Sequence, residues 1–422
     1  MIRKKKKRIV IIGNSAAGLS ALEAFRRKDQ NSAIVIIDQE PHLAYSRVIT
    51  PYFIMGEIKK EGGLFLKTET FYKDLNVNTL FGEKVLSIDV QSRKVVLDDG
   101  KKEPFDLLLI ATGASPTRPK IEGRIEKDIY VLRSLSDAKQ LKKVKGKARN
   151  FLFLGAGLVS LQTLQALYTS KGEYTLVVKS DHILSKTLDY EASQIVERHL
   201  VKRGIRIIKE KDVVRLKGMN GSKIATLTHG EQIETDLIFA GKGVRPNMDF
   251  LDGGGVKIQN GILVNEYMET NEEGIYAAGD VAQAPDFFSA EKVNYGLWPS
   301  AVEQGEIVGK NMAGLKEIYS GNLRMNVTQI FSMPIVSIGD FGSMRVSETL
   351  IKKDEKNSIY RKICIDQNGA LIGAILINRI EDLGIIHGLI RARKNVDLLS
   401  KSMWESPTSY VSVYKNIMEG KL

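Results

Sequence analysis

One supersecondary pattern occurs twice in this sequence, and it constrains the fold more strongly than any other feature. Each copy is a buried strand, a glycine-containing turn, an amphipathic helix and a second buried strand. The first copy is expected over Arg8–Ile12, Gly13–Gly18, Leu19–Lys28 and Ala33–Ile37. The second copy is expected over Phe151–Leu154, Gly155–Gly157, Leu158–Tyr168 and Tyr174–Val178. Two copies of one such unit predict two α/β nucleotide-binding domains.

The first turn reads GNSAAG, and its small residues allow the backbone to approach a pyrophosphate closely. Gly13 and Gly18 are the outer glycines of the usual fingerprint, while Ser15 stands where the middle glycine is usual. A tight turn of small residues can also serve packing alone. Asp38, at the expected end of the second strand and about 20 residues past Gly18, adds the carboxylate that binds a ribose in this fingerprint. Together the turn and the carboxylate favour a bound dinucleotide.

The second turn reads GAGLVS, so Ser160 stands where a third glycine normally eases packing of the helix on the strand. Val178, Lys179 and Ser180 stand where the ribose carboxylate is expected. The missing acid weakens discrimination in favour of NADH, and Lys179 can attract a 2′-phosphate. Because Lys179 can equally be a solvated charge at a strand end, the residues leave the choice of nucleotide open.

A third element, GIYAAGDVA, is expected to be a buried strand ending in a glycine that is followed by Asp280. An aspartate at a strand tip can accept a hydrogen bond from a ribitol hydroxyl, and we expect a helix to follow it and to point its positive end at a phosphate. A Gly-Asp turn means little alone. Its weight comes from its position after two Rossmann-like units.

Further strands are expected before three loops, and the last quarter of the chain differs in kind. The expected strands are Lys94–Leu97, Asp106–Ile110 before ATGASP, Asp236–Ala240 before GKGVRPN, and Gly274–Ala278 before GDVA. From about Gly321 onward the pattern changes to short strands, a hairpin at Asn368-Gly369 and a helix near residues 380–393. We therefore expect a separate α+β domain there.

Composition excludes several classes of site. The chain has 422 residues, 43% of them apolar, but only one cysteine, Cys364. An internal disulfide and a cysteine-ligated metal or iron–sulfur cluster are therefore ruled out, and the five histidines show no ligand spacing. The basic N-terminus imitates a secretory signal, but its apolar run, Ile9 to Ile12, is too short. No apolar run approaches the roughly 20 residues of a membrane span, so a soluble cytoplasmic protein without a metal is expected.

Six ordered segments resemble the FAD-dependent pyridine nucleotide oxidoreductases, the two-dinucleotide flavoproteins that include rubredoxin, ferredoxin and nitrite reductases. The segments are GNSAAG with Asp38, LLLIATGASP, GAGLVS, GKGVRPN, IYAAGDVA and LWPSAVEQG. The resemblance covers about Lys7 to Gly314. It implies an α/β fold in which an FAD-binding domain, 1–118 and 244–320, is interrupted by an NAD(P)-binding domain, 119–243, and followed by a C-terminal α+β domain, 321–422.

The resemblance also implies which residues hold each cofactor. Those implied for FAD are Gly13, Ser15, Ala17, Gly18, Asp38, Arg47, Val85 through its backbone, Ala111, Thr112, Gly113 and Asp280. Those implied for NAD(H), with NADP(H) left open, are Gly155, Gly157, Lys179 and Gly241. Pro299 suits the first position of a helix, whose N-terminus, after Leu297 and Trp298, would face the N1/O2 edge of the flavin; Trp298 can equally be a core aromatic.

The destination of the electrons is constrained by a missing thiol. Relatives that reduce disulfides, peroxide or coenzyme A disulfide carry a redox cysteine in a segment that here reads AYSRVITPYF, and Val48 stands at that position. An acidic iron–sulfur carrier or an iron–sulfur subunit is therefore the expected partner. The net charge of +12 agrees with this, although a lysine-rich solvated surface explains it as well.

Other assignments stay open at this level. The chain can be the flavin subunit of a complex such as phenylglyoxylate dehydrogenase, or a homodimer. It can be an NADH oxidase that makes peroxide, or a flavin-binding regulatory protein that has lost turnover. The direction of electron flow is equally open, and the family resemblance favours NADH only weakly.

Near the flavin N5 edge, the resemblance places neutral residues where ferredoxin reductases have a lysine and a glutamate. Tyr52 aligns with the lysine and Gln162 with the glutamate. Because a buried ion pair that loses one partner leaves an uncompensated charge, loss of both members together is expected. We predict that Tyr52 and Gln162 lie on the same side of the isoalloxazine. An alignment slipped by one residue would instead make Tyr52 an ordinary core aromatic.

Overall fold

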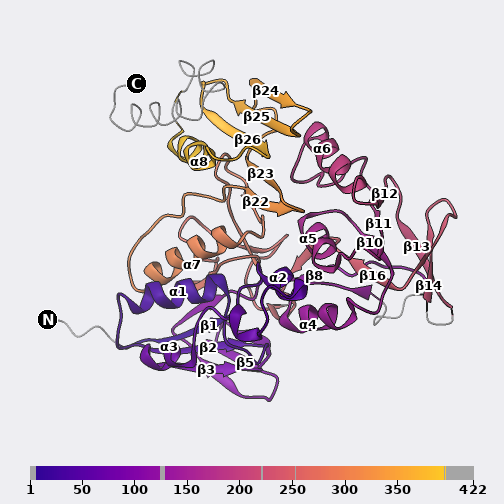
Figure 1. Cartoon of the computed structure of the whole chain (residues 1–422). Coiled ribbons are helices and arrows are strands. Elements are labelled where there is room, and N and C mark those ends of the chain that lie inside the picture. The colour runs from indigo at the N-terminus through magenta and orange to yellow at the C-terminus, as the bar shows by residue number, and fades with distance from the viewer. Residues whose placement is uncertain (1–5, 124–128, 220–221, 252, 394, 396–422) are drawn as a thin grey trace. The chain divides into compact units, whose positions relative to one another are not determined.

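The computed structural model describes residues 6–123, 129–219, 222–251, 253–393 and 395 (Figure 1). It divides into two compact units. The first contains the described residues within 1–117, 133–142 and 243–323, and the second those within 118–132, 143–242 and 324–422. The domain boundaries expected from the sequence stay a prediction. The two units group residues 133–142 with the first Rossmann domain and the described C-terminal residues with the second.

The first unit is built on a five-stranded parallel sheet in the order β19-β7-β1-β2-β3. Its strands are β1 (Arg8–Ile12), β2 (Ala33–Asp38), β3 (Val77–Phe81), β7 (Leu107–Ile110) and β19 (Ile275–Ala277). The central strands are apolar runs because both faces of a parallel sheet are covered. Ile12, Ile110 and Ala277 end neighbouring strands at one edge. The turn GNSAAG and the loops ATGASP and GDVA therefore begin at the same edge of the sheet.

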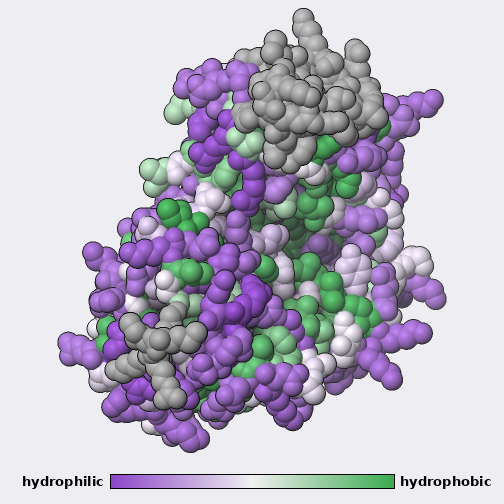
Figure 2. All heavy atoms as spheres, turned by 90° about the vertical axis from the view of Figure 1, so that its left-hand side faces the viewer, coloured by the Kyte–Doolittle hydropathy of each residue, from purple (hydrophilic) through white to green (hydrophobic). Residues whose placement is uncertain are grey.

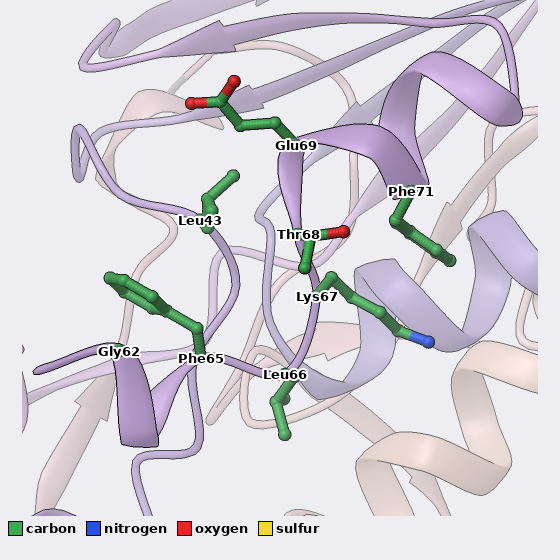
Figure 3. Close-up of a pocket in the computed structure, with 8 residues that line it drawn as sticks. All are labelled: Leu43, Gly62, Phe65, Leu66, Lys67, Thr68, Glu69 and Phe71. Atoms are coloured by element: carbon green, nitrogen blue, oxygen red, sulfur yellow. The ribbon is translucent and has the colours of Figure 1, made fainter.

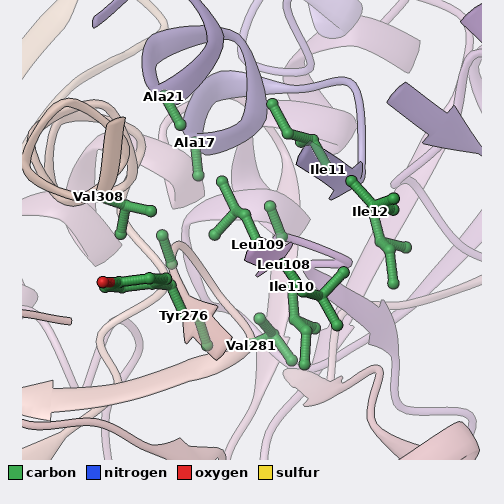
Figure 4. Packing of buried hydrophobic residues seen from close by; sticks show 14 of the residues in the cluster. Ile11, Ile12, Ala17, Ala21, Leu108, Leu109, Ile110, Tyr276, Val281 and Val308 are labelled. Carbon is green, nitrogen blue, oxygen red and sulfur yellow. The ribbon is translucent and has the colours of Figure 1, made fainter. Parts of the chain in front are cut away.

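Two helices of the first unit pack together at unusually close range. They are α1 (Ala16–Arg26) and α7 (Trp298–Met312). A Cβ on Gly305 would lie 2.2 Å from the Ala17 carbonyl oxygen, and one on Gly309 would lie 2.3 Å from that of Ala21. Figure 4 shows Ala17 and Ala21 on the side of α1 that faces Val308 of α7. The glycines of the segment LWPSAVEQG and of the next helical turn therefore set the contact between α7 and α1.

Smaller elements complete the first unit. The helical ones are α2 (Thr50–Met55), η1 (Glu61–Leu64), α3 (Glu69–Asp74), α4 (Leu135–Val144) and η3 (Asp249–Leu251). An antiparallel sheet contains β4 (Val85–Asp89), β5 (Lys94–Leu97) and β6 (Lys102–Pro104). Shorter pairings join β8 (Ala114–Pro116) to β17 (Val244–Pro246), and β20 (Ala282–Pro285) to β18 (Ile262–Leu263) and β21 (Lys292–Val293).

The second unit contains another five-stranded parallel sheet, in the order β12-β11-β10-β16-β9. Its strands are β9 (Ile129–Tyr130), β10 (Asn150–Leu154), β11 (Glu173–Val177), β12 (Ile205–Ile208) and β16 (Leu237–Ala240). The helices α5 (Leu158–Leu167) and α6 (Tyr190–Val201) follow β10 and β11. An antiparallel sheet of β13 (Val213–Met219), β14 (Ser222–Leu227) and β15 (Gln232–Thr235) precedes β16.

The C-terminal segment forms a five-stranded sheet in the order β22-β23-β26-β25-β24, and it is antiparallel throughout. Its elements are β22 (Met325–Ile330), β23 (Met333–Gly339), β24 (Glu348–Asp354), β25 (Ile359–Ile365), β26 (Leu371–Ile377) and α8 (Leu383–Ala392). The hairpin predicted at Asn368-Gly369 joins β25 to β26. The predicted fold class, two Rossmann-like domains followed by an α+β domain, is therefore confirmed, while residues 396–422 lie outside the described ones.

Two local expectations from the sequence were wrong. The helix of the first copy begins at Ala16, inside the segment expected to be a turn, because Ser15 is its N-cap. No helix follows Asp280 directly. Residues 282–285 instead form β20, whose backbone pairs with β18 and β21. The next helix along the chain is α7, which begins at Trp298, one residue before Pro299.

Hydrophilic side chains cover most of the face drawn in Figure 2, with hydrophobic ones in separate patches. Within the described ranges, no helix combines the length and the apolar character that crossing a membrane requires.

Candidate functional site

The first glycine turn lies so close to neighbouring backbone that two of its positions admit only glycine. A Cβ on Gly13, whose φ is +114°, would lie 2.1 Å from the Ala111 carbonyl oxygen. A Cβ on Gly18 would lie 1.9 Å from the Gly13 carbonyl oxygen. The turn therefore lies directly against the start of the loop ATGASP, and its peptide groups are free of side chains that would hold a ligand away.

The N-terminus of α1 can accept an anion. Among the described residues, no side chain caps it, because the hydroxyl of its N-cap residue Ser15 makes no capping bond. The first N–H groups of a helix have no partner within the helix and carry its positive end. Nearby, the amide nitrogen of the Asn14 side chain is buried and has no hydrogen-bond partner in the described part of the chain, while its oxygen accepts from Tyr72 at 2.8 Å. These features fit a bound dinucleotide phosphate.

Asp38 ends β2 beside this turn, as the sequence predicts. Its carboxylate accepts hydrogen bonds from the backbone nitrogens of Asn14, at 2.7 Å, and Glu40, at 2.8 Å. Burial nevertheless raises the pKa of Asp38, because it outweighs these two bonds and the nearby Arg47 charge. A carboxylate held by backbone donors on one side can accept from ribose hydroxyls on the other.

Arg47 forms the centre of a polar network on the same unit. One of its terminal nitrogens lies 2.6 Å from a carboxylate oxygen of Glu40, and the other donates to the Tyr45 hydroxyl at 2.7 Å and to the Arg133 carbonyl at 2.9 Å. The Tyr45 hydroxyl in turn accepts from the backbone nitrogen of Leu135 at 2.9 Å. The network fixes the segment after β2 against the start of α4.

Asp280 pairs with an arginine that sequence reasoning missed. The Arg133 guanidinium donates to the Asp280 carboxylate at 2.7 Å, and both side chains are largely buried. A Cβ on Gly113 would come within 3.2 Å of the same guanidinium. Arg133 therefore lies where the ATGASP loop and the GDVA loop converge. Little in the sequence indicated this, because residues 133–142 belong to the first unit while the chain on either side of them belongs to the second.

The loops ATGASP and GVRPN are joined by reciprocal hydrogen bonds. The Thr112 hydroxyl donates to the Asn247 carbonyl at 2.7 Å, and the Asn247 side-chain amide donates to the Thr112 carbonyl at 2.9 Å. The Asn247 backbone nitrogen donates to the Gly113 carbonyl at 2.9 Å. The short β8–β17 pairing continues this contact. Ala111, Thr112 and Gly113 are thus held at the sheet edge by Asn247, which lies 135 residues after Thr112 in the chain.

The helix α7 supports the same edge. Gln304 accepts from the Gly279 backbone nitrogen at 2.7 Å and donates to the Asn322 side chain at 2.9 Å. Trp298, at the start of α7, is half-buried and packs against the hydrophobic core of the unit. No side chain caps the N-terminus of α7 within the described residues. Val85 is buried at the start of β4, next to the same core.

The second glycine turn is built differently. A Cβ on Gly155, at φ +95°, would lie 2.7 Å from the Gly241 carbonyl oxygen. Ser160 is fully buried, and its hydroxyl lies 2.0 Å from where a Gly241 Cβ would stand. Gly157 is the N-cap of α5, and no side chain caps this helix among the described residues. The turn therefore offers a second open helix N-terminus, which fits a second dinucleotide.

Lys179 follows this turn's second strand and is part of a charged triad. Its ammonium lies 3.0 Å from one carboxylate oxygen of Asp212, and Lys242 pairs with the other oxygen. Neither Asp212 nor Lys242 was among the residues predicted from the sequence. Lys242 lies inside the quoted segment GKGVRPN, so its position was visible. Asp212 had no local signal, because only the pairing of neighbouring strands brings it to Lys179.

Tyr52 belongs to the first unit and Gln162 to the second, so the surroundings of each are given within its own unit. Tyr52 lies in α2 and is 42% exposed, so it is not an ordinary core aromatic. The Gln162 amide donates to the Thr328 hydroxyl of β22 at 3.0 Å. Their predicted approach to each other stays a prediction.

A shallow hollow of about 460 Å³ lies elsewhere on the first unit (Figure 3). Leu43, Phe65, Leu66 and Phe71 supply its apolar lining, and Lys67 lies beside the Phe71 ring. None of the predicted site residues lines it.

Two other kinds of redox or metal site receive no support. The described side chains contain no group of three or more histidine, cysteine, aspartate or glutamate residues arranged for a metal ion. Cys364 is buried in β25, and burial raises the pKa of its thiol to about 11. At neutral pH this thiol is protonated and therefore a poor nucleophile.

Comparison with known proteins matches almost the whole chain. The family model "Pyridine nucleotide-disulphide oxidoreductase" matches residues 7–305, and "Rubredoxin NAD+ reductase C-terminal domain" matches residues 325–394. The epsilon subunit of NADH-dependent phenylglyoxylate dehydrogenase from Aromatoleum evansii is 31% identical over 400 residues, which cover 94% of each chain. Rubredoxin-NAD(+) reductase from Pseudomonas putida is 29% identical, covering 72% of this chain and 80% of that one.

The fold has a close structural counterpart. A ferredoxin reductase from Rhodopseudomonas palustris superposes with a TM-score of 0.86 at 21% identity, covering 92% of this chain and 95% of that one. The matched model extends over both glycine turns and the loops that meet them. The protein is therefore an FAD-dependent oxidoreductase that uses a nicotinamide dinucleotide, and it belongs to the pyridine nucleotide-disulphide oxidoreductase family.

Proposed function

We propose that the first unit holds FAD at the edge where its three loops meet. Gly13, Ser15, Ala17 and Gly18 form the phosphate turn, and Asp38 accepts hydrogen bonds from the adenosine ribose. Val85 meets the adenine through its backbone, and Arg47 and its network hold the segment after β2. Ala111, Thr112, Gly113 and Asp280 bind the ribitol and flavin part. Three observations support this assignment: the close backbone contact at Gly13, the open N-terminus of α1 and the unpartnered Asn14 amide.

The second turn then binds the nicotinamide dinucleotide. In this assignment Gly155, Gly157 and Gly241 allow the backbone to approach the cofactor, and Lys179 lies near its adenosine end. Bound FAD supplies the redox chemistry, since it can take a hydride from the nicotinamide and release the two electrons singly. The protein contributes alignment and charge. The open N-terminus of α7 is suited to stabilise negative charge on a reduced cofactor.

Electrons leaving the flavin go to an iron–sulfur protein, as a separate carrier or as a partner subunit. The observation that carries this proposal is the missing thiol: Val48 occupies the redox-cysteine position, and the single cysteine is buried in the C-terminal sheet. The names of the relatives support it, since one is a rubredoxin-NAD(+) reductase and another is a subunit of an NADH-dependent dehydrogenase. The net charge of +12 suits an acidic carrier. A cytoplasmic location and a homodimer stay predictions.

Anaerobic half-reactions test this proposal. The protein is reduced with NADH, then mixed either with oxidised ferredoxin or rubredoxin or with air-saturated buffer, while the flavin absorbance is followed. We expect fast reoxidation by an iron–sulfur carrier and slow reoxidation by air. Fast reoxidation by air alone would instead identify an oxidase. If neither NADH nor NADPH reduced the flavin, the protein would be a flavin-binding protein without turnover.

Salt dependence sharpens the same experiment. Attraction between a basic reductase and an acidic carrier is screened beyond a Debye length of roughly 8–10 Å at ordinary ionic strength. The carrier-dependent rate should therefore fall steeply with added salt, while reduction by NADH changes much less. A carrier rate that does not respond to salt would remove charge attraction from the account.

A further inference from the structure

The adenosine end of the second turn lacks the acid that a preference for NADH normally requires. In Rossmann units a carboxylate at the end of the second strand accepts from the ribose 2′-hydroxyl, and a cation at this end accommodates the 2′-phosphate of NADP(H). Here Val178 and Lys179 follow β11 directly. The local sequence thus offers a cation and no carboxylate at this position.

Asp212 brings a carboxylate to this position from the neighbouring strand. The end of β11 is joined to the segment after β12 by backbone bonds: Val178 nitrogen to Ile208 oxygen at 2.9 Å, and Lys211 nitrogen to Val178 oxygen at 3.0 Å. Asp212 follows Lys211 immediately. Its carboxylate lies 3.0 Å from the Lys179 ammonium, so the two residues share the same corner of the sheet edge.

Lys242 fixes this carboxylate from the opposite side. It follows Gly241 at the end of β16, and its Cγ lies 3.9 Å from where a Gly155 Cβ would stand. The side chain therefore runs past the glycine turn before its ammonium pairs with Asp212. The Lys242 and Asp212 side chains are 19% and 21% exposed, whereas Lys179 is 73% exposed. Asp212 and Lys242 form the shielded part of the triad, and Lys179 is its solvent-exposed member.

The charge state of Asp212 follows from these contacts. Partial burial opposes ionisation, but the bonds from Lys242 and Lys179 outweigh it and lower the pKa of Asp212. The residue is an anion at neutral pH. Two other lysines of this corner have carboxylate partners of their own, Lys209 with Glu197 at 3.0 Å and Lys211 with Glu231 at 2.7 Å.

We propose that Asp212 is a specificity-determining residue that makes this site select NADH over NADPH. It replaces the carboxylate missing from the end of β11 and accepts from the 2′-hydroxyl. It also holds the Lys179 ammonium, so that this lysine does not recruit the phosphate. The inference rests on the assignment of the second turn to the nicotinamide dinucleotide.

Binding of adenosine fragments tests this without any turnover. Calorimetric titrations with 5′-AMP and adenosine 2′,5′-bisphosphate compare the two ribose states in the native protein, Asp212→Asn, Lys179→Gln and the double variant. Asparagine keeps an oxygen for the Val213 backbone nitrogen, which donates to Asp212 at 3.0 Å, so the loop is expected to fold. We expect the native protein to prefer 5′-AMP. Asp212→Asn should raise the affinity for the bisphosphate relative to 5′-AMP about tenfold or more, which is the effect of losing one hydrogen bond to a charged group.

The double variant and two charge controls identify the cause. If Lys179 is the group that Asp212 restrains, Lys179→Gln should abolish the gain seen in Asp212→Asn. Asp181→Asn removes a negative charge from the segment after β11 that also contains Lys179, at a residue paired with His182, and should leave the ratio unchanged. Lys211→Gln removes a cation paired with Glu231 and should do the same. The ratio of NADH to NADPH in flavin reduction should follow the fragment ratio.

Two results would overturn the proposal in distinguishable ways. A native preference for the bisphosphate, or an Asp212→Asn ratio equal to that of Asp181→Asn, would mean that Asp212 does not set selectivity. Failure of both fragments to bind any variant, with NADH also unable to bind, would reject the underlying assignment of the turn.

Discussion

The two Rossmann units of this chain share the order of four of their five strands and a glycine turn, but they relieve the same crowding differently. In the first unit, Gly18 of the helix lies against the Gly13 carbonyl, and no Cβ fits between them. In the second, Ser160 occupies the equivalent helix position, and its hydroxyl fills the space that a Gly241 side chain would need. The second unit therefore has a serine in the helix and a glycine, Gly241, after the neighbouring strand. The consensus of a turn is thus set by the volume available at the contact.

The units also differ in what covers the helix after the turn. In the first, α7 packs on α1 through Gly305 and Gly309. In the second, the hairpin of β22 and β23 makes polar contacts with α5: Gln162 donates to Thr328, and Gln165 accepts from the Phe331 backbone nitrogen at 2.9 Å. The first cover rests on close backbone packing, to which Ser20 of α1 adds one hydrogen bond to the Val302 carbonyl of α7 at 2.7 Å. The second depends on hydrogen bonds of two glutamine side chains.

The largest expected effect is that of a side chain on the first turn. Gly13→Ala should give a protein without bound flavin and with much reduced folding yield, because its Cβ meets backbone at 2.1 Å and its φ is +114°. Flavin content per chain after purification measures it. Gly62→Ala, in the same unit with nothing within 4 Å of the new Cβ, is the matched control. A yellow Gly13→Ala protein would mean that this backbone contact is not required.

The equivalent change in the second turn should separate the two cofactors. Gly155→Ala, with a backbone contact at 2.7 Å, should keep its flavin but lose most of its affinity for NADH. Equilibrium binding of NAD+ and the rate of flavin reduction by NADH check this. If Gly155→Ala lost flavin as readily as Gly13→Ala, the division of labour between the units would be wrong.

Substitution on the helix cover should act on stability. Gly309→Ala forces a Cβ to within 2.3 Å of the Ala21 carbonyl, and overpacking of this kind costs about 1–3 kcal/mol or more. Gly384→Ala is the control, because this exposed glycine of α8 has nothing within 4 Å and alanine favours a helix by about 1 kcal/mol. Thermal unfolding should show opposite shifts for the two variants. Equal shifts in melting temperature would indicate that α7 and α1 can accommodate a Cβ at Gly309 without loss of stability.

A smaller effect is expected for the predicted pair Tyr52 and Gln162. If they act together near the flavin, the variants Tyr52→Phe and Gln162→Leu should show coupling in the rate of flavin reduction by NADH. Gln162 also bonds to Thr328, so Thr328→Val serves as the control for that contact alone. Additive effects on the rate would reject the pairing.

No effect is expected from blocking the thiol. Cys364 is buried with a pKa of about 11, so at pH 8 only about one thiol in a thousand is ionised, a fraction that grows as the pH approaches 11. Treatment with iodoacetamide at pH 8, and the substitution Cys364→Ala, should leave flavin reduction by NADH unchanged. Strong inhibition by the reagent in the native protein, absent in Cys364→Ala, would implicate this cysteine.

Much of the fold was predictable because its signals are local. Four strands of the first parallel sheet, three of the second, both glycine turns and the β25–β26 hairpin follow from apolar runs and turn residues, and the strand over Arg8–Ile12 has the predicted bounds. The strands β3, β9 and β12 were not predicted. The helix expected after Asp280 was wrong because residues 282–285 pair as a strand with β21, which follows closely, and with β18, which precedes Asp280 in the chain. Arg133 and Asp212 were also missed. Arg133 pairs with Asp280 and Asp212 with Lys179, and in both cases the partner lies far away in the sequence, where no local pattern indicates it.

The most direct test of the central claim, that flavin on the first unit is reduced by a nicotinamide dinucleotide bound at the second, is an anaerobic titration. The purified yellow protein is titrated with NADH while the visible absorbance of its flavin is recorded. We predict complete bleaching at about one NADH per FAD, since both carry two electrons, and no bleaching of Gly155→Ala over the same range. A flavin that stays oxidised in the native protein under excess NADH and NADPH would contradict the account.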